Sequence, residues 1–268
     1  MRHNRMFCFV VLTTSLFVAP IANALAAAPC APVSKAKSPQ SDRSFEPCDP
    51  EFTYANQADW GGACNSGGIQ SPINISNAVV DERLSAPAFS YRSAGPSVFN
   101  DCNHYTIKVF PAGDSSTLIY GGHPYRLKEF HFHLPAEDLI AGDRSAMEVH
   151  LVHEGIDDPK LTLVVAVLVK AGAPNGLIAI LWQHIPDEGV RESPPITINP
   201  DRLLPPRDKR GFYTFAGSLT TPPCTPGLTW IVLKEPITFS PDQIKRYTYH
   251  GTARKDQPVN REIKQTKN

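Results

Sequence analysis

The sequence lacks a charge excess of either sign, because its 26 lysines and arginines are matched by 26 aspartates and glutamates. This composition excludes the strongly basic character typical of proteins that bind nucleic acid or anionic membrane surfaces. The chain also lacks internal repeats, and no glycine- or serine-rich linker divides residues 48–265. Its 268 residues are therefore expected to contain one large domain.

Segments with helical periodicity are scarce, whereas proline is abundant, with 26 residues. Proline is excluded from helix interiors, so it divides the chain into short strands and loops. The segments predicted as strands are residues 106–110, 125–134, 146–154, 161–170, 212–216 and 228–233. Helices are predicted over residues 175–185 and 240–251, the second beginning with Ser240 as N-cap and Pro241 and ending at Gly251. We therefore predict a β-rich, mixed α/β single domain.

The N-terminus has the composition of a secretory signal peptide. Arg2 and Arg5 provide a basic start, an apolar run follows, and small residues near position 24 suit cleavage. The apolar run is short for a membrane span, which favours a cleaved signal over residues 1–26 rather than a stable anchor. Residues 27–47 have the composition of a disordered leader. The mature protein is expected to be periplasmic or secreted.

Export affects the interpretation of the cysteines, because an oxidising compartment favours disulfides. Removal of the signal peptide with Cys8 leaves five, namely Cys30, Cys48, Cys64, Cys102 and Cys224. Their spacing does not match a zinc–thiolate site, and an odd number leaves one thiol unpaired. Spacing alone does not determine which cysteines pair.

Two short phrases contain three candidate metal ligands. Residues 129–133 read Glu-Phe-His-Phe-His, and residues 148–153 read Glu-Val-His-Leu-Val-His. Both phrases are predicted strands, and side chains two residues apart in a strand share a face. His131 and His133 therefore project side by side, and His150 from a neighbouring strand can complete a three-nitrogen site. Three imidazoles with an open fourth position are the ligand set of a catalytic zinc ion.

The residues around these histidines favour a metal site over a merely polar sheet surface. Glu129 shares a face with His131, and Glu148 shares a face with His150. Carboxylates in such places hydrogen-bond ligand imidazoles and fix their orientation. His153 points to the opposite face and is interpreted as a buried structural residue.

Six longer phrases resemble those of the bacterial, secreted α-class carbonic anhydrases. They lie at residues 67–74, 130–133, 147–153, 217–223, 230–237 and 257–261. They follow the family's order and cover about residues 48–265, the expected catalytic domain. The resemblance implies one large, twisted, mostly antiparallel sheet with short peripheral helices, and zinc at the base of a conical cleft.

The resemblance also implies an activity and the residues that perform it. The expected reaction is reversible hydration of carbon dioxide to bicarbonate and a proton, by attack of zinc-bound hydroxide on carbon dioxide. His131, His133 and His150 match the zinc ligands, and Thr220 matches the threonine that orients the hydroxide. Glu137 matches the carboxylate that partners this threonine. The positions implied for the substrate wall and cleft mouth are Val152, Val164, Leu219, Thr221, Leu228 and Trp230.

The residue that carries the proton to solvent is less directly matched. In the family this is a histidine ending an Asn-Asn-Gly-His phrase, whereas here the chain reads Asp-Cys-Asn-His-Tyr over residues 101–105. Counting back from Val109 puts Tyr105 in this position, and aligning the histidines requires one extra residue. We favour His104 because histidine titrates near neutral pH, and Tyr105 stays open as the alternative.

Two further features rest on the same resemblance. Cys64 and Cys224 match positions that are bridged in extracellular members, and a Cys48–Cys102 bond is a second expectation that leaves Cys30 free. Glu129 occupies a position that is commonly glutamine.

A catalytically inactive binding relative and a zinc esterase are the alternative functions, although binding relatives typically lose a ligand histidine. The oligomeric state is not indicated, and a homodimer stays open.

Overall fold

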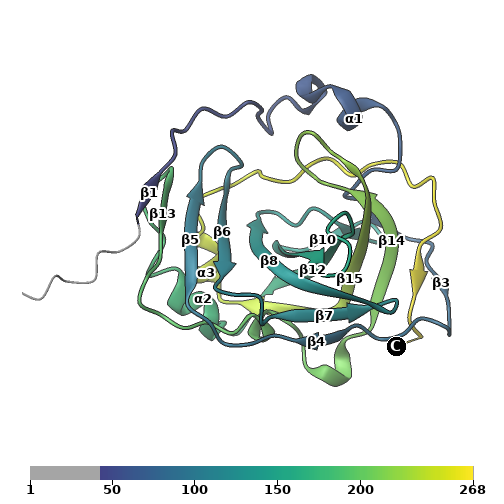
Figure 1. The fold of residues 1–268 in the computed structure, drawn as a ribbon. Helices are drawn as coiled ribbons and strands as arrows, with labels where there is room; N and C mark the ends of the chain where they lie inside the picture. The colour runs from purple at the N-terminus through teal and green to yellow at the C-terminus, as the bar shows by residue number, and fades with distance from the viewer. Residues whose placement is uncertain (1–42, 268) are drawn as a thin grey trace, which may run out of the picture. The chain divides into compact units, whose positions relative to one another are not determined.

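The computed structural model describes residues 43–267, and most of these residues are organised around a 13-stranded sheet (Figure 1). Its strands are β1 (Ser44–Phe45), β3 (Val79–Val80), β4 (Ala88–Ser90), β5 (Pro96–Asp101), β6 (Thr106–Pro111), β7 (Thr117–Tyr120), β8 (His123–His133), β11 (Met147–Gly155), β12 (Thr162–Ala171), β13 (Val190–Glu192), β14 (Phe212–Ser218), β15 (Pro226–Phe239) and β16 (Lys264–Gln265). A small sheet contains β2 (Asn74–Ile75), β9 (Leu139–Ile140) and β10 (Asp143–Arg144). The α-helices are α1 (Gly62–Asn65), α2 (Gly176–Leu181) and α3 (Pro241–Arg246).

The strand order of the large sheet is β1-β13-β5-β6-β8-β11-β12-β15-β14-β16-β3, and β7 joins β4 to β8 beside this path. Most neighbouring strands are antiparallel, with parallel pairing of β12 with β15 and of β16 with β3. The short α-helices lie at the periphery of the sheet (Figure 1). The predicted fold class is confirmed, and all six predicted strands are present. Five of them agree within about two residues at each end, whereas the segment predicted at residues 228–233 is part of the longer β15, which continues to Phe239.

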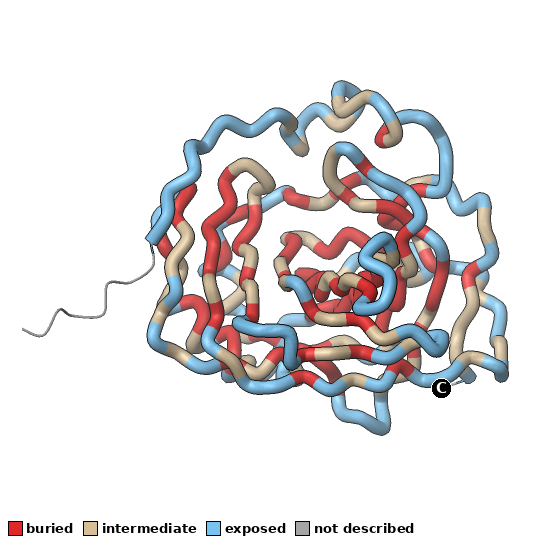
Figure 2. Tube along the Cα trace, in the orientation of Figure 1, coloured by how far each residue is buried: buried red, intermediate tan, exposed pale blue. Residues whose placement is uncertain are grey.

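Strand β12 lies in the interior of the sheet, between β11 and β15, and most of its residues are buried (Figure 2). Val165 and Val167 belong to one apolar cluster, whereas Val164 and Ala166 belong to a second cluster. Alternate residues of a strand point to opposite faces, so a strand between two apolar layers must be apolar at nearly every position. This explains the Leu/Val run from which the strand was predicted.

Both predicted helices are shorter in the structure. Helix α3 begins as predicted, with a capping box in which Ser240 and Gln243 satisfy each other's backbone N–H groups. It ends at Arg246 rather than at Gly251, so the predicted C-terminus is wrong. Tyr247 and Tyr249 are buried in the core, and an extended backbone directs these alternate side chains inward. Helix α2 covers residues 176–181 of the predicted 175–185.

The N-terminal part of the chain extends the domain beyond the expected boundary. The predicted signal peptide, most of the predicted leader and Cys30 lie outside the described residues. Ser44 and Phe45, which were assigned to the leader, form β1 and pair with β13. Among residues 43–267, none of the helices has the length and apolar character needed to cross a membrane.

Two disulfides tie the N-terminal region to the sheet. Cys64 is bonded to Cys224, and Cys48 is bonded to Cys102. The first bond joins helix α1 to the loop that follows β14, and the second holds the turn between β5 and β6. Both loops border the candidate site described below.

His153 is a structural residue of the core, in agreement with its predicted orientation. It is fully buried, and its Nε2 lies 2.7 Å from the Tyr91 hydroxyl, while its Nδ1 lies 3.3 Å from the Leu163 carbonyl oxygen. Burial lowers the pKa of His153 to about 4, so the ring is neutral at ordinary pH.

Candidate metal centre

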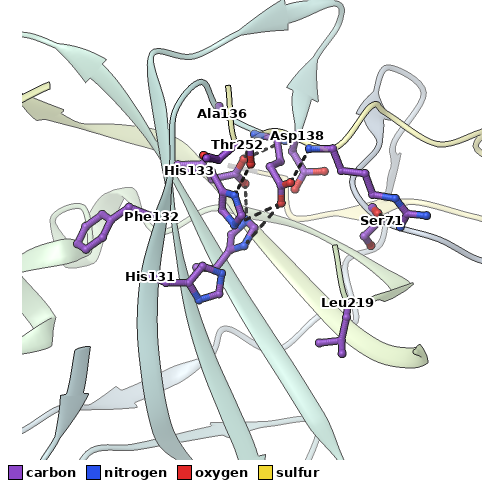
Figure 3. A network of polar contacts seen from close by, with 12 residues as sticks. Ser71, His131, Phe132, His133, Ala136, Asp138, Leu219 and Thr252 are labelled. Carbon is purple, nitrogen blue, oxygen red and sulfur yellow. Dashed lines mark hydrogen bonds and ion pairs between the residues drawn. The ribbon is translucent and has the colours of Figure 1, made fainter. Parts of the chain in front are cut away.

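The three candidate ligands lie on two adjacent strands. His131 and His133 are on β8, His150 is on β11, and the antiparallel register places His150 opposite His131. Figure 3 shows His131 and His133 on one side of their strand and Phe132 on the other. The ligand nitrogens of the three histidines lie within 4.8 Å of one another, a spacing at which one metal ion can bind all three.

The histidines of β8 each use one ring nitrogen for an outer partner. His131 Nδ1 lies 3.0 Å from Glu129 Oε1, and His133 Nδ1 lies 2.7 Å from the carbonyl oxygen of Thr252. An N–H group on Nδ1 that donates to these acceptors leaves the Nε2 lone pair free on both rings. These contacts fix the tautomer and the orientation that a ligand imidazole requires.

Glu148 holds the third histidine. Its Oε1 lies 3.4 Å from His150 Nε2, and its Oε2 accepts hydrogen bonds from the backbone N–H groups of Glu137 and Asp138 at 2.7 and 2.9 Å. Although burial acts in the opposite direction, contact with Glu148 raises the pKa of His150. Because Nε2 of His150 faces Glu148, the Nδ1 of His150 is the nitrogen available to the centre.

The environment of His133 fits a bound metal ion. Its Nε2 is buried and has no hydrogen-bond partner, which is costly unless another group satisfies the nitrogen. Burial and the nearby His150 and His131 lower the pKa of His133 well below its ordinary value. Burial also lowers the pKa of His131. Neutral imidazoles are the metal-binding form of histidine, so the donor set suits a zinc ion.

Glu137 and Thr220 form a buried pair beside the histidines. Glu137 is fully buried, and its Oε2 lies 3.5 Å from His133 Nε2. Burial raises the pKa of Glu137 to about 7, while hydrogen bonds from the Arg254 backbone N–H and the Thr220 side chain act in the opposite direction. A hydroxyl whose proton is donated to Glu137 presents only lone pairs to a further group. Thr220 can therefore act as an acceptor of defined direction.

An apolar cluster lies next to the histidines. It contains five of the residues expected to contact the substrate, namely Val152, Val164, Leu219, Leu228 and Trp230. The Trp230 ring centroid is 4.9 Å from that of His150, and Val164 pairs with Val152 on one side and with Trp230 on the other. Thr221 is partly exposed in the turn that follows β14 and is not part of this cluster.

The close approach of β14 to this cluster requires glycine at position 217. A Cβ atom there would lie 2.2 Å from Ser71 Oγ and 2.5 Å from Trp230 Cδ1, distances that atoms do not reach without displacement. The Trp230 indole N–H donates to the Ser218 carbonyl oxygen at 3.1 Å. The indole beside His150 is therefore fixed by both packing and a hydrogen bond.

His104 and Tyr105 have different environments. The side chain of His104 is 42% exposed and lines a cleft of about 550 Å³ together with Phe52, Pro222 and Pro223. Tyr105 has a positive φ of 54°, and its hydroxyl donates to the Phe52 carbonyl oxygen at 3.1 Å. The hydroxyl of Tyr105 is therefore engaged in a hydrogen bond, whereas the side chain of His104 is partly exposed in the cleft.

The C-terminal segment contains functional residues that the sequence analysis missed. The Thr252 carbonyl oxygen contacts His133, and the Arg254 backbone N–H donates to Glu137 at 2.8 Å. The Arg254 guanidinium is buried and donates to Gln70 Oε1 and to the Cys64 carbonyl oxygen. Backbone groups can belong to any residue type, so the sequence does not mark them. Arg254, which lies three residues before the matched phrase at residues 257–261, could nevertheless have drawn attention to this segment.

The fold and the site define a class of protein in which one large twisted sheet carries a candidate three-histidine metal centre. Residues 55–268 match the family model of eukaryotic-type carbonic anhydrases. The chain is 39% identical over 197 residues to a carbonic anhydrase from Neisseria gonorrhoeae, a match that covers 73% of this chain and 75% of that protein. A second similar protein, from Klebsiella pneumoniae, is 36% identical over 200 residues, with 74% and 79% covered.

Solved structures agree with this match. The α-carbonic anhydrase of Photobacterium profundum has a TM-score of 0.71 and 34% identity, covering 81% of this chain and 98% of that one. The chain belongs to the eukaryotic-type, or α-class, carbonic anhydrase family.

Proposed function

We propose that this protein is a zinc-dependent enzyme that catalyses the reversible hydration of carbon dioxide to bicarbonate and a proton. The observation that carries the proposal is the cluster of His131, His133 and His150, each held by an outer partner so that one nitrogen faces a common point. Hydration of carbon dioxide is the general activity of the family to which the chain belongs.

Zinc held by these histidines would supply a water acidified to a nucleophile near neutral pH. Thr220 would accept a hydrogen bond from this nucleophile, because its own hydroxyl proton would be donated to Glu137. The threonine thereby restricts the direction in which the nucleophile's lone pair points, which is an orientation effect. Glu137 acts through Thr220, and Arg254 and Glu148 hold the segment from which Glu137 projects.

Carbon dioxide is small and apolar, so a binding surface for it must be apolar and close to the nucleophile. The cluster around Val152, Val164, Leu219, Leu228 and Trp230 supplies such a surface next to His150. Thr221 would lie at the mouth of this site. The product proton would leave through His104, which lies in the cleft bordered by Pro222 and Pro223.

The two disulfides support a location in an oxidising compartment, such as a periplasm or the extracellular medium. This location agrees with the expected signal peptide at residues 1–26.

Metal analysis combined with stopped-flow hydration tests the proposed function. We expect one zinc per chain and fast hydration that is lost after treatment with a chelator and restored by zinc. Bound zinc without hydration would instead indicate a binding relative, and ester turnover that exceeds hydration would indicate an esterase.

Replacing Thr220 by valine tests the orientation role. Thr220→Val keeps the size of the side chain but removes the hydroxyl, so we expect kcat/KM for hydration to fall by about 100-fold, the typical loss for misplaced reactants. Zinc content should stay at one per chain. Thr225→Val is the matched control, because Thr225 is exposed in the same loop. Equal activity of the two variants would contradict the role of Thr220.

A further inference from the structure

A buried carboxylate connects two side chains that lie near the candidate metal centre. His104 Nδ1 lies 2.8 Å from Asp101 Oδ2, and Lys108 Nζ lies 2.7 Å from the same oxygen. The backbone N–H of His104 donates to the other oxygen, Oδ1, at 3.1 Å. The Asp101 side chain is only 3% exposed, so these contacts are shielded from water. We refer to Asp101, His104 and Lys108 as the Asp101 cluster.

The loop that carries His104 is held by the two residues that precede it. Cys102 is bonded to Cys48, and Asn103 Oδ1 accepts from the Asp49 backbone N–H at 2.7 Å. Asn103 also donates to the Pro47 carbonyl oxygen at 3.0 Å. Because the backbone is fixed by these contacts, the contact with Asp101 determines the orientation of the imidazole.

The Asp101 cluster lies between the histidine centre and solvent. Val109 on β6 pairs with Phe130 on β8, and both are core residues. In this antiparallel register the next positions, Lys108 and His131, lie beside each other on the opposite face of the sheet. At its other end the cluster reaches the solvent cleft through His104.

Ion pairing keeps the carboxylate of the cluster charged. Although burial acts in the opposite direction, the close contact with His104 and the charge of Lys108 lower the pKa of Asp101 to about 2. Asp101 is therefore negatively charged throughout the ordinary pH range, and its Oδ2, 2.8 Å from His104 Nδ1, favours a proton on that nitrogen by charge attraction. The lone pair of the neutral ring then lies on Nε2, the other ring nitrogen.

We propose that Asp101 is a positioning residue for proton transfer, which keeps His104 in the tautomer whose Nε2 exchanges protons with water in the cleft. The proposal rests on the proposed function. His104 Nε2 would accept one proton from a cleft water and release the same proton to a buffer base, while the proton on Nδ1 stays on the ring beside Asp101. The ring is thus restored without rotation, and Lys108 keeps Asp101 ionised.

Asp101→Asn tests the proposal. An asparagine that still accepts from the His104 backbone N–H turns its NH2 group toward the ring, which favours the tautomer with the proton on Nε2. We expect kcat in dilute buffer to fall by about fivefold to tenfold, a modest part of a typical general acid–base effect. Because the proton leaves after hydration, kcat/KM should be unchanged. Imidazole buffer should restore kcat both in Asp101→Asn and in His104→Ala.

Two comparisons separate positioning from a structural role. The double variant Asp101→Asn/His104→Ala should lose no more turnover than His104→Ala alone, because Asp101 acts through His104. Asp81→Asn is the matched control, since Asp81 also binds two cations, Arg83 and Lys264, but lies outside the cleft lining. Additive losses, a parallel fall in kcat/KM, or no restoration by imidazole would overturn the proposal.

Nitrogen NMR of the His104 ring provides a readout that is independent of activity. We expect a proton on Nδ1 in the unmodified protein and on Nε2 in Asp101→Asn. A proton on Nε2 in the unmodified protein would overturn the inference even if hydration is fast. Absence of zinc-dependent hydration in the unmodified protein would instead contradict the proposed function.

Discussion

His131→Ala is expected to remove the bound zinc and to lower carbon dioxide hydration by at least about 1,000-fold. Three protein ligands hold a catalytic zinc ion, whose fourth position stays open. Loss of a residue that only hydrogen-bonds a ligand already lowers metal affinity or activity by about 10- to 100-fold, so loss of a ligand itself should cost more. His131 is the suitable ligand to replace, because its side chain is 16% exposed whereas that of His133 is 2% exposed. The variant should therefore fold.

His123→Ala is the matched control for this prediction. His123 is the first residue of the same strand, β8, and is exposed at the opposite end from His133. This variant should keep one zinc per chain and full hydration. Metal analysis, stopped-flow rates and circular dichroism distinguish loss of zinc from loss of structure. A folded His131→Ala protein with a full complement of zinc and normal turnover would contradict the assigned centre.

Removal of the Cys64–Cys224 bond is expected to lower the free energy of unfolding by about 4 kcal/mol. The bond joins residues separated by 160 positions, and a cross-link that closes a long loop restricts the unfolded chain strongly. Its loss should also loosen the turn after Thr220, since the Cys224 N–H donates to the Thr221 carbonyl oxygen at 2.8 Å. Urea unfolding of Cys64→Ser/Cys224→Ser measures the change.

Cys48→Ser/Cys102→Ser is the comparison for this prediction. Its bond spans 54 positions, so its removal should lower stability by less than removal of Cys64–Cys224. The second variant leaves the Thr220 turn tied to helix α1. A greater loss of stability in this variant than in Cys64→Ser/Cys224→Ser would contradict the loop-length argument.

Much of the fold and the centre of the site could be predicted because they depend on local periodicity. The spacing of His131 and His133 places both rings on one face of a strand, whatever the rest of the fold. The direct pairing of His150 with His131 needed the strand register, for which the sequence analysis relied on the family resemblance. Strand β12 could be predicted from its Leu/Val run, because a strand that is covered on both faces has no polar side.

Other features could not be predicted because they depend on distant contacts. The Thr252 carbonyl oxygen reaches His133 across 119 positions, and any residue type carries such a group. The end of α3 at Arg246 follows from burial of Tyr247 and Tyr249, which overrides the stop signal at Gly251. Asp101 lay within the phrase considered for proton transfer, but its contacts with His104 and Lys108 require the turn between β5 and β6 to be formed.

The position of Thr252 and Arg254 late in the chain has a consequence for biosynthesis. A nascent polypeptide that has been translated only as far as β15 already contains all three histidines and both members of the Thr220–Glu137 pair. It lacks the carbonyl group that orients His133 and the N–H group that holds Glu137. The proposed centre would therefore be completed only after the segment around Thr252 and Arg254 has left the ribosome, which would postpone tight binding of the proposed metal until this segment can fold onto the sheet.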